Sequence, residues 1–133
     1  MSDETVLVIG GGIAGLALAR ALSQRDVPFE LAERDPAAGD GGLAINLPGN
    51  AVAALHALGL RAGLEKIGRP TRRREYRSAA GRVLFAVDED EFWGPDARPR
   101  CVRRSDLHAL LGEDIDRTVG RVGPVELDAS GVR

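Results

Sequence analysis

"VLVIGGGIAGLALARAL", residues 6–22, passes from a run of aliphatic residues through three consecutive glycines into an alanine- and leucine-rich segment. The run from Thr5 to Gly10 has the composition of a central strand that is buried on both faces. Apolar residues then recur at helical spacing from Ile13 to Gln24, and residues 29–32 follow as a second short strand that closes at Glu33. This order predicts one βαβ unit with two parallel strands and a right-handed crossover.

Gly10, Gly12 and Gly15 satisfy the pattern G-x-G-x-x-G between the predicted strand and helix. Gly10 allows the tight turn that leaves the strand. Gly12 allows the backbone to approach a pyrophosphate, and Gly15 allows the helix to lie close to the strand. The N–H groups near Ile13 and Ala14, together with the positive end of the helix dipole, would attract the phosphate charge. The alternative is a tight turn with a structural purpose only.

Glu33 follows Gly15 by eighteen positions and ends the second predicted strand. A carboxylate at that position can accept hydrogen bonds from both ribose hydroxyls of an adenosine. The glycine pattern, flanked by strand, helix, strand and terminal carboxylate, favours dinucleotide binding over a purely structural turn. Glu33 would repel a 2′-phosphate and so disfavours NADP, although the neighbouring Arg34 keeps that alternative open. The motif alone does not distinguish FAD from NAD.

The rest of the chain alternates between helical and extended patterns. In chain order it predicts a short extended stretch at 44–47, a helix at 50–58 with Asn50 as its N-cap, a second helix at 61–67 and a hairpin at 74–88. The prediction continues with an exposed acidic and proline-rich loop at 88–100, a strand at 101–104 and a helix at 105–115 capped by Ser105. It ends with a strand at 119–122 and the start of a last hairpin at 125–133. The last hairpin returns with only two residues, so we interpret the sequence as cut short.

Composition excludes several classes of function. The 133 residues suffice for one domain, and 18 basic against 20 acidic residues create no overall field that favours nucleic acid or an anionic membrane. The single cysteine, Cys101, excludes an internal disulfide and suits a reducing cytoplasm. His56 and His108 have no partners at metal-ligand spacing. We therefore expect a cytoplasmic protein with no signal peptide, membrane span, nucleic-acid partner or metal.

Three stretches in order carry a resemblance to a known family. They are residues 6–35, which end in the pair Glu33-Arg34, then "GLAINLPGNAVAALHALGL" at 42–60, and "VRRSDLHALL" at 102–111. Together they resemble the FAD-dependent aromatic hydroxylases, the class A flavoprotein monooxygenases of the para-hydroxybenzoate hydroxylase type. Ala44 stands where that family often has glycine, and Gly49 where it often has proline. The resemblance implies a three-layer α/β Rossmann-like FAD/NAD(P)-binding fold with a small β-hairpin insertion.

The resemblance also implies how a cofactor would be held. The glycines would bind the FAD pyrophosphate, Glu33 the adenosine ribose, and Arg34 would lie beside the adenine. Residues 43–47 would pass by the flavin side, and Arg104 would reach the phosphate or ribityl region. The predicted cofactor-binding residues are Gly10, Gly12, Ile13, Ala14, Gly15, Glu33, Arg34, Gly42, Leu43, Ala44 and Arg104. We name no catalytic and no metal-binding side chain.

In the complete enzyme, as the resemblance implies, NAD(P)H reduces the flavin and dioxygen hydroxylates an aromatic or polyketide-like small molecule. The family's second FAD signature, a Gly-Asp pair followed closely by histidine and proline, does not occur in this sequence. We therefore expect residues 1–133 to be the N-terminal part of an FAD-binding domain, with residues 70–101 forming a hairpin and loop of the substrate-side sheet. A missing C-terminal segment or a second chain would complete it.

Two other functions stay open. The chain could be a non-catalytic nucleotide-binding or interaction fragment that needs a partner, or an NAD-dependent oxidoreductase domain. The relative affinities for FAD and NAD distinguish the flavoprotein from the NAD-dependent domain. Reduction of bound flavin by NAD(P)H distinguishes the monooxygenase from the non-catalytic fragment.

Overall fold

The computed structural model describes residues 5–37, 39, 42–124, 127–128 and 131–132. The chain divides into two compact units. Unit 1 comprises the described residues of Met1–Asp40 and Leu111–Arg133, and unit 2 those of Gly41–Leu110. The glycine motif therefore lies in unit 1 and the predicted hairpin in unit 2.

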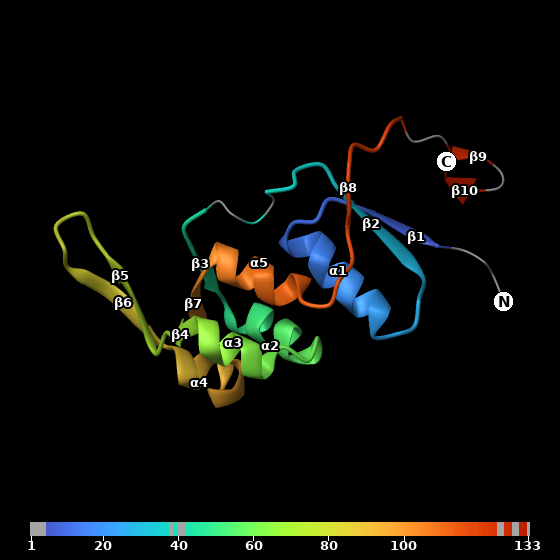
Figure 1. Ribbon diagram of the computed structural model, residues 1–133. Helices are drawn as coiled ribbons and strands as arrows, with labels where there is room; N and C mark the ends of the chain where they lie inside the picture. The colour runs from blue at the N-terminus through green and yellow to red at the C-terminus, as the bar shows by residue number, and fades with distance from the viewer. Residues whose placement is uncertain (1–4, 38, 40–41, 125–126, 129–130, 133) are drawn as a thin grey trace. The chain divides into compact units, whose positions relative to one another are not determined.

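Unit 1 contains the predicted βαβ unit. Strand β1 (Val6–Ile9), helix α1 (Ile13–Ser23) and strand β2 (Phe29–Glu33) follow one another, and the two strands pair in parallel. Helix α1 packs against both strands (Figure 1). Strand β8 (Thr118–Val119) pairs in parallel with β2, which gives the order β1-β2-β8. The parallel sheet and its crossover helix confirm the α/β Rossmann-like fold.

The prediction that β1 is buried on both faces is wrong. Of its four residues only Val8 is buried, whereas Leu7 is 41% and Ile9 59% exposed. Within the part of the chain that the structure describes, β1 is an edge strand, and α1 covers one of its faces. Burial depends on which elements lie beside a strand, and an aliphatic run does not specify those neighbours.

The core of unit 1 is formed by apolar side chains from helix α1, from strands β1 and β2, and from the end of helix α5 (Arg104–Gly112). Its buried residues are Val8, Leu16, Ala19, Leu31 and Leu111. The Arg20 guanidinium donates hydrogen bonds to the carbonyl oxygens of Leu111 at 3.4 Å and Glu113 at 2.6 Å. These bonds occupy carbonyls that the end of α5 would otherwise leave without a helical partner. The predicted helix through Ile115 is thus too long, since α5 ends at Gly112.

Strands β9 (Leu127–Asp128) and β10 (Gly131–Val132) pair antiparallel, as the predicted final hairpin requires. The sequence predicts the turn at Ala129-Ser130-Gly131. Ala129 and Ser130 lie outside the described residues, and Gly131 belongs to β10 rather than to the turn. The pair has two residues in each strand, so the ladder between them is short.

Unit 2 is built on a three-stranded antiparallel sheet in the order β3-β7-β4. Its sheet strands and main helices are β3 (Ala44–Leu47), α2 (Gly49–Ala57), α3 (Arg61–Ile67), β4 (Gly68–Pro70), β7 (Arg100–Arg103) and the start of α5. The sheet and helices bury one apolar core. Its residues are Leu47, Val52, Leu55, Leu60, Leu64, Val102 and Leu107.

Both predicted N-caps are wrong. Asn50 lies inside α2, which begins at Gly49 after Pro48, and Ser105 lies inside α5, which begins at Arg104. Each of these helices starts within two residues of the end of a strand. The strand-to-helix turn therefore sets the start of the helix, ahead of the residue with the best capping side chain.

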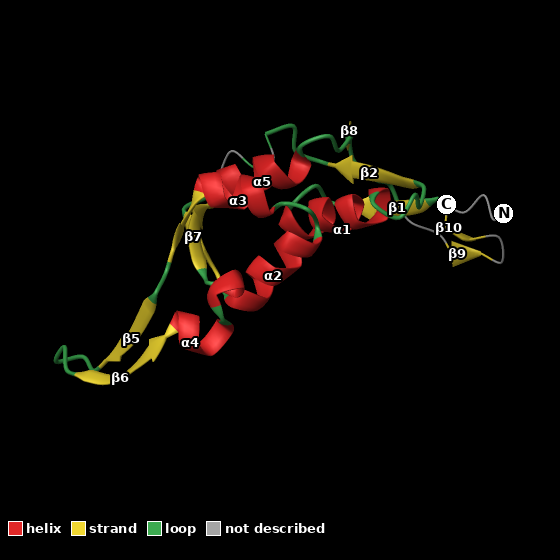
Figure 2. Cartoon of the chain, turned by 90° about the horizontal axis from the view of Figure 1, so that it is seen from below, coloured by secondary structure: helices red, strands yellow, loops and turns green. Residues whose placement is uncertain are grey.

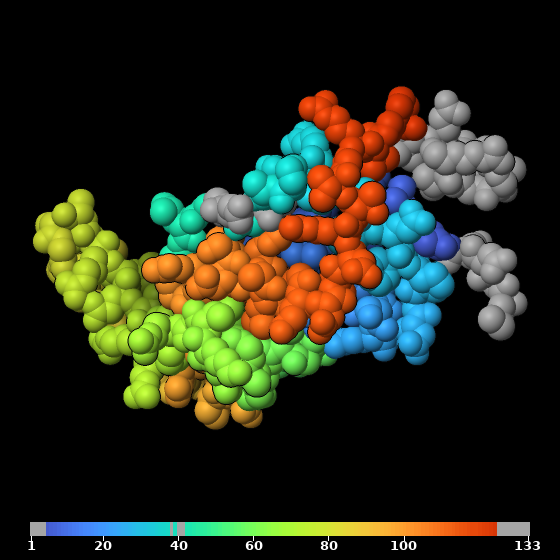
Figure 3. Space-filling view, viewed as in Figure 1, coloured from blue at the N-terminus to red at the C-terminus, as the bar shows by residue number. Residues whose placement is uncertain are grey.

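The predicted hairpin is confirmed. Strands β5 (Arg73–Arg77) and β6 (Val83–Asp88) pair antiparallel around Gly81, whose φ of +80° favours glycine. The two strands form a ribbon that projects from the β3-β7-β4 sheet of unit 2 (Figures 1 and 2). Figure 3 shows the same ribbon as a narrow arm of yellow-green atoms. The rings of Tyr76 and Phe85 stack across it with centroids 4.2 Å apart, which is the cross-strand contact expected to hold such a ribbon together.

The prediction of an exposed loop at residues 88–100 is wrong. Helix α4 (Glu89–Trp93) and a 3-10 turn (Pro95–Ala97) occupy most of it. The Asp88 carboxylate accepts hydrogen bonds from the backbone N–H groups of Asp90 at 2.9 Å and Glu91 at 3.0 Å. Asp88 with Glu91 three positions later is a capping pattern, and it was the local signal for this helix.

Replacing the capping carboxylate tests this account of α4. We expect Asp88→Ala to lower the free energy of unfolding by about 1 kcal/mol, because two N–H groups lose their acceptor. Asp88→Asn keeps an acceptor oxygen and should retain most of the stability. Urea unfolding followed by the fluorescence of Trp93, the sole tryptophan, measures both variants. Equal losses for alanine and asparagine would contradict the capping role.

Candidate functional site

The glycine turn after β1 has the geometry that its spacing predicts. Gly10 has a φ of +102°, and its N–H donates to the carbonyl oxygen of Ala32 at 2.8 Å. A Cβ on Gly15 would overlap the carbonyl oxygen of Gly10, so only glycine lets α1 lie this close to the end of β1. Gly12 is the N-cap of α1, and no atom lies within 4 Å of the place a Cβ would take. The turn is therefore closed on the side of the sheet and open at Gly12.

Glu33 closes the same turn from the end of β2. Its Oε2 accepts the N–H of Gly11 at 2.6 Å, and its Oε1 accepts the N–H of Asp35 at 2.8 Å. These two bonds lower the pKa of Glu33 below its ordinary value, the Asp35 N–H contributing most and the Gly11 N–H next. The carboxylate is accordingly ionised at neutral pH and is fixed against the glycine turn.

Gly11 belongs to the site although the sequence reasoning assigned it no role. It is buried, and a Cβ there would lie 3.1 Å from the Cβ of Glu33. The available signal was that glycine also occupies the position between Gly10 and Gly12, which the G-x-G-x-x-G pattern leaves open. A side chain at this position would push the Glu33 carboxylate away from the turn.

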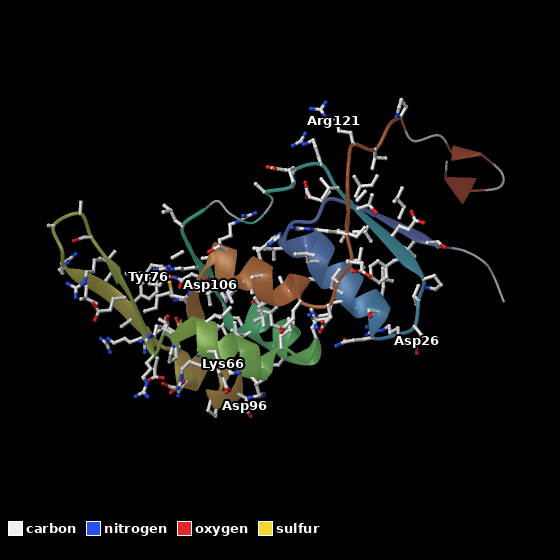
Figure 4. All side chains as sticks on the ribbon, in the orientation of Figure 1. Asp26, Lys66, Tyr76, Asp96, Asp106 and Arg121 are labelled. Atoms are coloured by element: carbon white, nitrogen blue, oxygen red, sulfur yellow. The ribbon has the colours of Figure 1, made fainter. Side chains whose placement is uncertain are left out.

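A pocket of about 450 Å³ opens at the carboxyl ends of the three parallel strands. It is lined by Ile9, Gly10, Ala32, Glu33, Arg34, Gly120, Arg121 and Val122. The backbone N–H of Gly120 donates to the carbonyl oxygen of Glu33 at 2.8 Å, which places the residues after β8 beside β2. Arg121, which brings a positive charge, belongs to this stretch after β8 (Figure 4). Ligands of open parallel sheets bind at this edge of the strands.

Gly120, Arg121 and Val122 were also missed as site residues. The sequence does predict a strand at residues 119–122, and the carboxyl ends of parallel strands share one edge. The signal was therefore present, but it required the pairing of β8 with β2, which lie far apart in the chain.

The start of α1 adds an electrostatic component. Ile13 and Ala14 form the beginning of its first turn, and that turn carries no acidic side chain. The N–H groups there and the positive end of the helix dipole are therefore not neutralised by the helix itself. A helix start after a glycine turn, beside an ionised carboxylate, can bind a phosphate with the helix and accept sugar hydroxyls with the carboxylate.

The other predicted cofactor residues meet in unit 2. The N–H of Arg104 donates to the carbonyl oxygen of Leu43 at 3.0 Å, and a Cβ on Gly42 would lie 2.8 Å from Cδ of Arg104. Gly42 has a φ of +109°, and Leu43 is 88% exposed. Ala44 begins β3, opposite Arg103 of β7. The structure thus gathers the predicted residues into two groups, one in each unit, and their contact with a cofactor stays a prediction.

The two histidines take no part in either group. His108 is buried in α5, and His56 is half-buried in α2, where burial followed by the charge of Arg61 lowers its pKa. Among the residues that the structure describes, no three histidine, cysteine, aspartate or glutamate side chains are placed to hold a metal ion. No helix in the described ranges is long and apolar enough to cross a membrane.

Comparison with known proteins agrees with this geometry. Residues 8–60 match a family model described as an NAD(P)-binding Rossmann-like domain. The chain is 36% identical over 114 residues to 3-amino-4-hydroxybenzoate 2-monooxygenase of Streptomyces cremeus, with 82% of this chain covered. It is 39% identical over 138 residues to the FAD-dependent monooxygenase pynG of Aspergillus niger, with 96% of this chain covered.

The chain is a homologue of FAD-dependent monooxygenases. It matches 28% of the length of the Streptomyces enzyme and 31% of that of the Aspergillus enzyme. The crystal structure of HpxO from Klebsiella pneumoniae complexed with FAD and uric acid is similar with a TM-score of 0.81 and 28% identity, over 98% of this chain and 34% of that one. The expected family resemblance and Rossmann-like fold are confirmed, and the chain spans about a third or less of these relatives.

The depressed pKa of Glu33 predicts a pH dependence. Because hydrogen bonds favour the ionised form, a carboxyl titration followed by NMR should place its midpoint below the ordinary value of 4.5. Relative to Glu33→Gln, the unmodified chain should gain stability that is fully present above pH 4.5 and is lost as the pH falls through the folded pKa. A stability difference that does not change with pH in this window would contradict the role of the two N–H groups.

Proposed function

We propose that unit 1 binds the adenosine diphosphate part of FAD, and that the chain serves an NAD(P)H-dependent flavin monooxygenase that hydroxylates a small aromatic or polyketide-like compound. The observation that carries this proposal is the Glu33 carboxylate, which is ionised and fixed against the glycine turn at the carboxyl edge of a parallel sheet. Homology to FAD-dependent monooxygenases over most of the chain selects FAD among the dinucleotides.

The residues of unit 1 fit such a ligand. In this proposal Gly10, Gly12 and Gly15, with the N–H groups at Ile13 and Ala14, hold the pyrophosphate. The Glu33 carboxylate accepts backbone N–H groups at both oxygens and retains lone pairs that can accept the ribose hydroxyls. Arg34 and Arg121 line the pocket beyond Glu33 and would flank the adenine with two cations. The open space at Gly12 leaves room for the phosphate oxygens.

Unit 2 contributes the second group of residues. We propose that Gly42, Leu43 and Ala44 pass along the flavin part of the cofactor, and that Arg104 reaches its phosphate or ribityl region. The bond from the Arg104 N–H to Leu43 holds these residues in one arrangement, and the exposed Leu43 offers an apolar surface to a ring. When bound, FAD would supply the electron transfer and oxygen chemistry, while the chain binds and orients it.

The wider function is proposed on the same basis. NAD(P)H would be the reductant, the substrate a small aromatic molecule, and a further protein segment or second chain would complete the site. We also propose that the segment 70–101, which contains the ribbon of β5 and β6 and the short helix α4, belongs to the substrate side of the complete enzyme. The protein would act in the cytoplasm, which a single cysteine suits.

A single substitution separates cofactor binding from folding. Gly12 has a φ of −76° and no neighbour within 4 Å of a Cβ, so Gly12→Ala should fold. Alanine is a poorer N-cap than glycine but restricts the unfolded chain, so the two effects oppose each other and the unfolding temperature should change little. Its affinity for FAD should fall roughly tenfold or more, because the added methyl group displaces the pyrophosphate from charge-assisted N–H bonds. Quenching of FAD fluorescence on titration with protein measures the affinity.

Gly112→Ala is the matched control, because a Cβ there meets only Leu16 at an ordinary contact distance of 3.6 Å. It should leave FAD affinity unchanged. Tighter binding of NAD than of FAD would favour the NAD-dependent alternative. FAD binding without reduction by NADH or NADPH would favour a non-catalytic fragment. No FAD binding by the folded chain would overturn the proposal.

A further inference from the structure

The glycine turn has no side chains of its own that could hold it in one conformation. Gly10, Gly11 and Gly12 follow one another, and no atom lies within 4 Å of the place a Cβ would take on Gly10 or on Gly12. Glycine loses more conformational freedom on folding than any other residue. The turn therefore needs contacts from other parts of the chain if its N–H groups are to keep one direction.

Backbone hydrogen bonds hold the two ends of this turn. The N–H of Gly10 donates to a carbonyl oxygen of β2 at 2.8 Å, and the carbonyl oxygen of Gly12 accepts the N–H of Leu16 at 2.9 Å. Between these ends, the N–H of Gly11 donates to Oε2 of Glu33 at 2.6 Å. The carboxylate thus reaches the middle of the turn from a position 22 residues later in the chain.

Glu33 can act as a fixed support because its own carboxylate is restrained. Its Oε1 accepts the N–H of Asp35 at 2.8 Å, and its Cβ lies 3.1 Å from the place a Cβ of Gly11 would take. A hydrogen bond from an N–H to an ionised carboxylate is stronger than one between two neutral groups. One side chain therefore joins the turn before α1 to the end of β2.

A carboxylate at this position is unfavourable for a diphosphate on charge alone. Glu33 and Gly10 line the same pocket, and like charges near one another raise the free energy of the bound state. If Glu33 served only the ribose hydroxyls, its removal would relieve that repulsion for any ligand that lacks them. If Glu33 also holds the turn, its removal would weaken the binding of such a ligand. The two roles thus predict changes in affinity of opposite sign.

We infer that Glu33 is a positioning residue for the glycine turn, because its Oε2 holds the Gly11 N–H and so directs the N–H groups at Ile13 and Ala14 before a ligand binds. This inference rests on the proposed function, and it adds a role in diphosphate binding that does not pass through the ribose. A turn that is ordered in advance binds more tightly, since less conformational entropy is lost on binding.

ADP and 2′,3′-dideoxy-ADP separate the two roles of Glu33. Both carry the same adenine and diphosphate, but the dideoxy compound has no ribose hydroxyl that could donate to the carboxylate. Titration into the ¹⁵N-labelled chain, followed by the amide NMR signals of Ile13 and Ala14, measures the affinity of each compound even where binding is weak. We expect Glu33→Ala to weaken binding of the dideoxy compound by roughly fivefold or more, and that of ADP further, since ADP also loses its hydroxyl contacts.

Glu33→Gln tests for rescue by a conservative change. Its side chain has one acceptor oxygen and one NH2 group, so it places a donor where one of the two backbone N–H groups needs an acceptor. Its affinity for the dideoxy compound should lie between those of the unmodified chain and of Glu33→Ala. Glu30→Ala is the matched control, because it removes an exposed carboxylate of the same strand that lines a different pocket. It should bind both compounds like the unmodified chain.

Equal or tighter binding of the dideoxy compound by Glu33→Ala would mean that Glu33 acts through the ribose alone, and would overturn the inference while leaving the proposed function in place. No binding of the dideoxy compound to the unmodified chain would have the same meaning. No binding of ADP or FAD to the folded, unmodified chain would overturn the proposed function and this inference with it. If neither variant of Glu33 folds, the carboxylate serves the fold of unit 1 as a whole, which contradicts a role specific to the ligand.

Discussion

The close approach of α1 to the end of β1 at Gly15 is the constraint on which unit 1 depends. The carbonyl oxygen of Gly10 occupies the place of a Gly15 side chain, so helix and strand meet at a distance that any Cβ would prevent. Because α1 starts directly at this turn, its N-terminal N–H groups lie next to the carboxyl end of β1. The crossover then returns β2 parallel to β1, and Glu33 ends opposite Gly11. The arrangement of the glycine turn, the start of α1 and Glu33 is thus a consequence of one helix–strand contact.

Local signals predicted the elements whose structure is decided locally. The βαβ unit and the ribbon of β5 and β6 follow from an aliphatic run, helical periodicity and glycines at turns. The helix at Glu89 was missed because acidic and proline-rich composition was given more weight than the capping pattern that begins at Asp88. The burial of β1 could not be predicted, because it depends on which strands pair beside it, and local sequence does not specify that pairing.

The residues of the candidate site also divide into those that local sequence predicts and those that depend on long-range pairing. The positions of Gly10, Gly15 and Glu33 followed from spacing alone, since all three lie in one supersecondary unit. The proposed cofactor roles of Gly42 and Arg104 came from a family resemblance. That these two residues are neighbours follows from the pairing of β3 with β7, which the sequence analysis did not predict. The place of Arg121 in the site needed knowledge of long-range pairing, because residues more than forty positions apart line its pocket.

The carboxylates of Glu33 and Glu89 differ in the hydrogen-bond donors that the protein supplies to them. Both oxygens of Glu33 accept backbone N–H groups, so its charge is stabilised whether or not a ligand is present, and a ligand can only add to that set. Glu89 has one oxygen bound by Arg74 and one with no donor in the described chain. Fixing an ionised acceptor in advance favours a polar ligand, because the site need not reorganise to bind it. A buried acceptor without a donor instead costs free energy in the folded state. The arrangement at Glu33 therefore suits a dinucleotide held at several points.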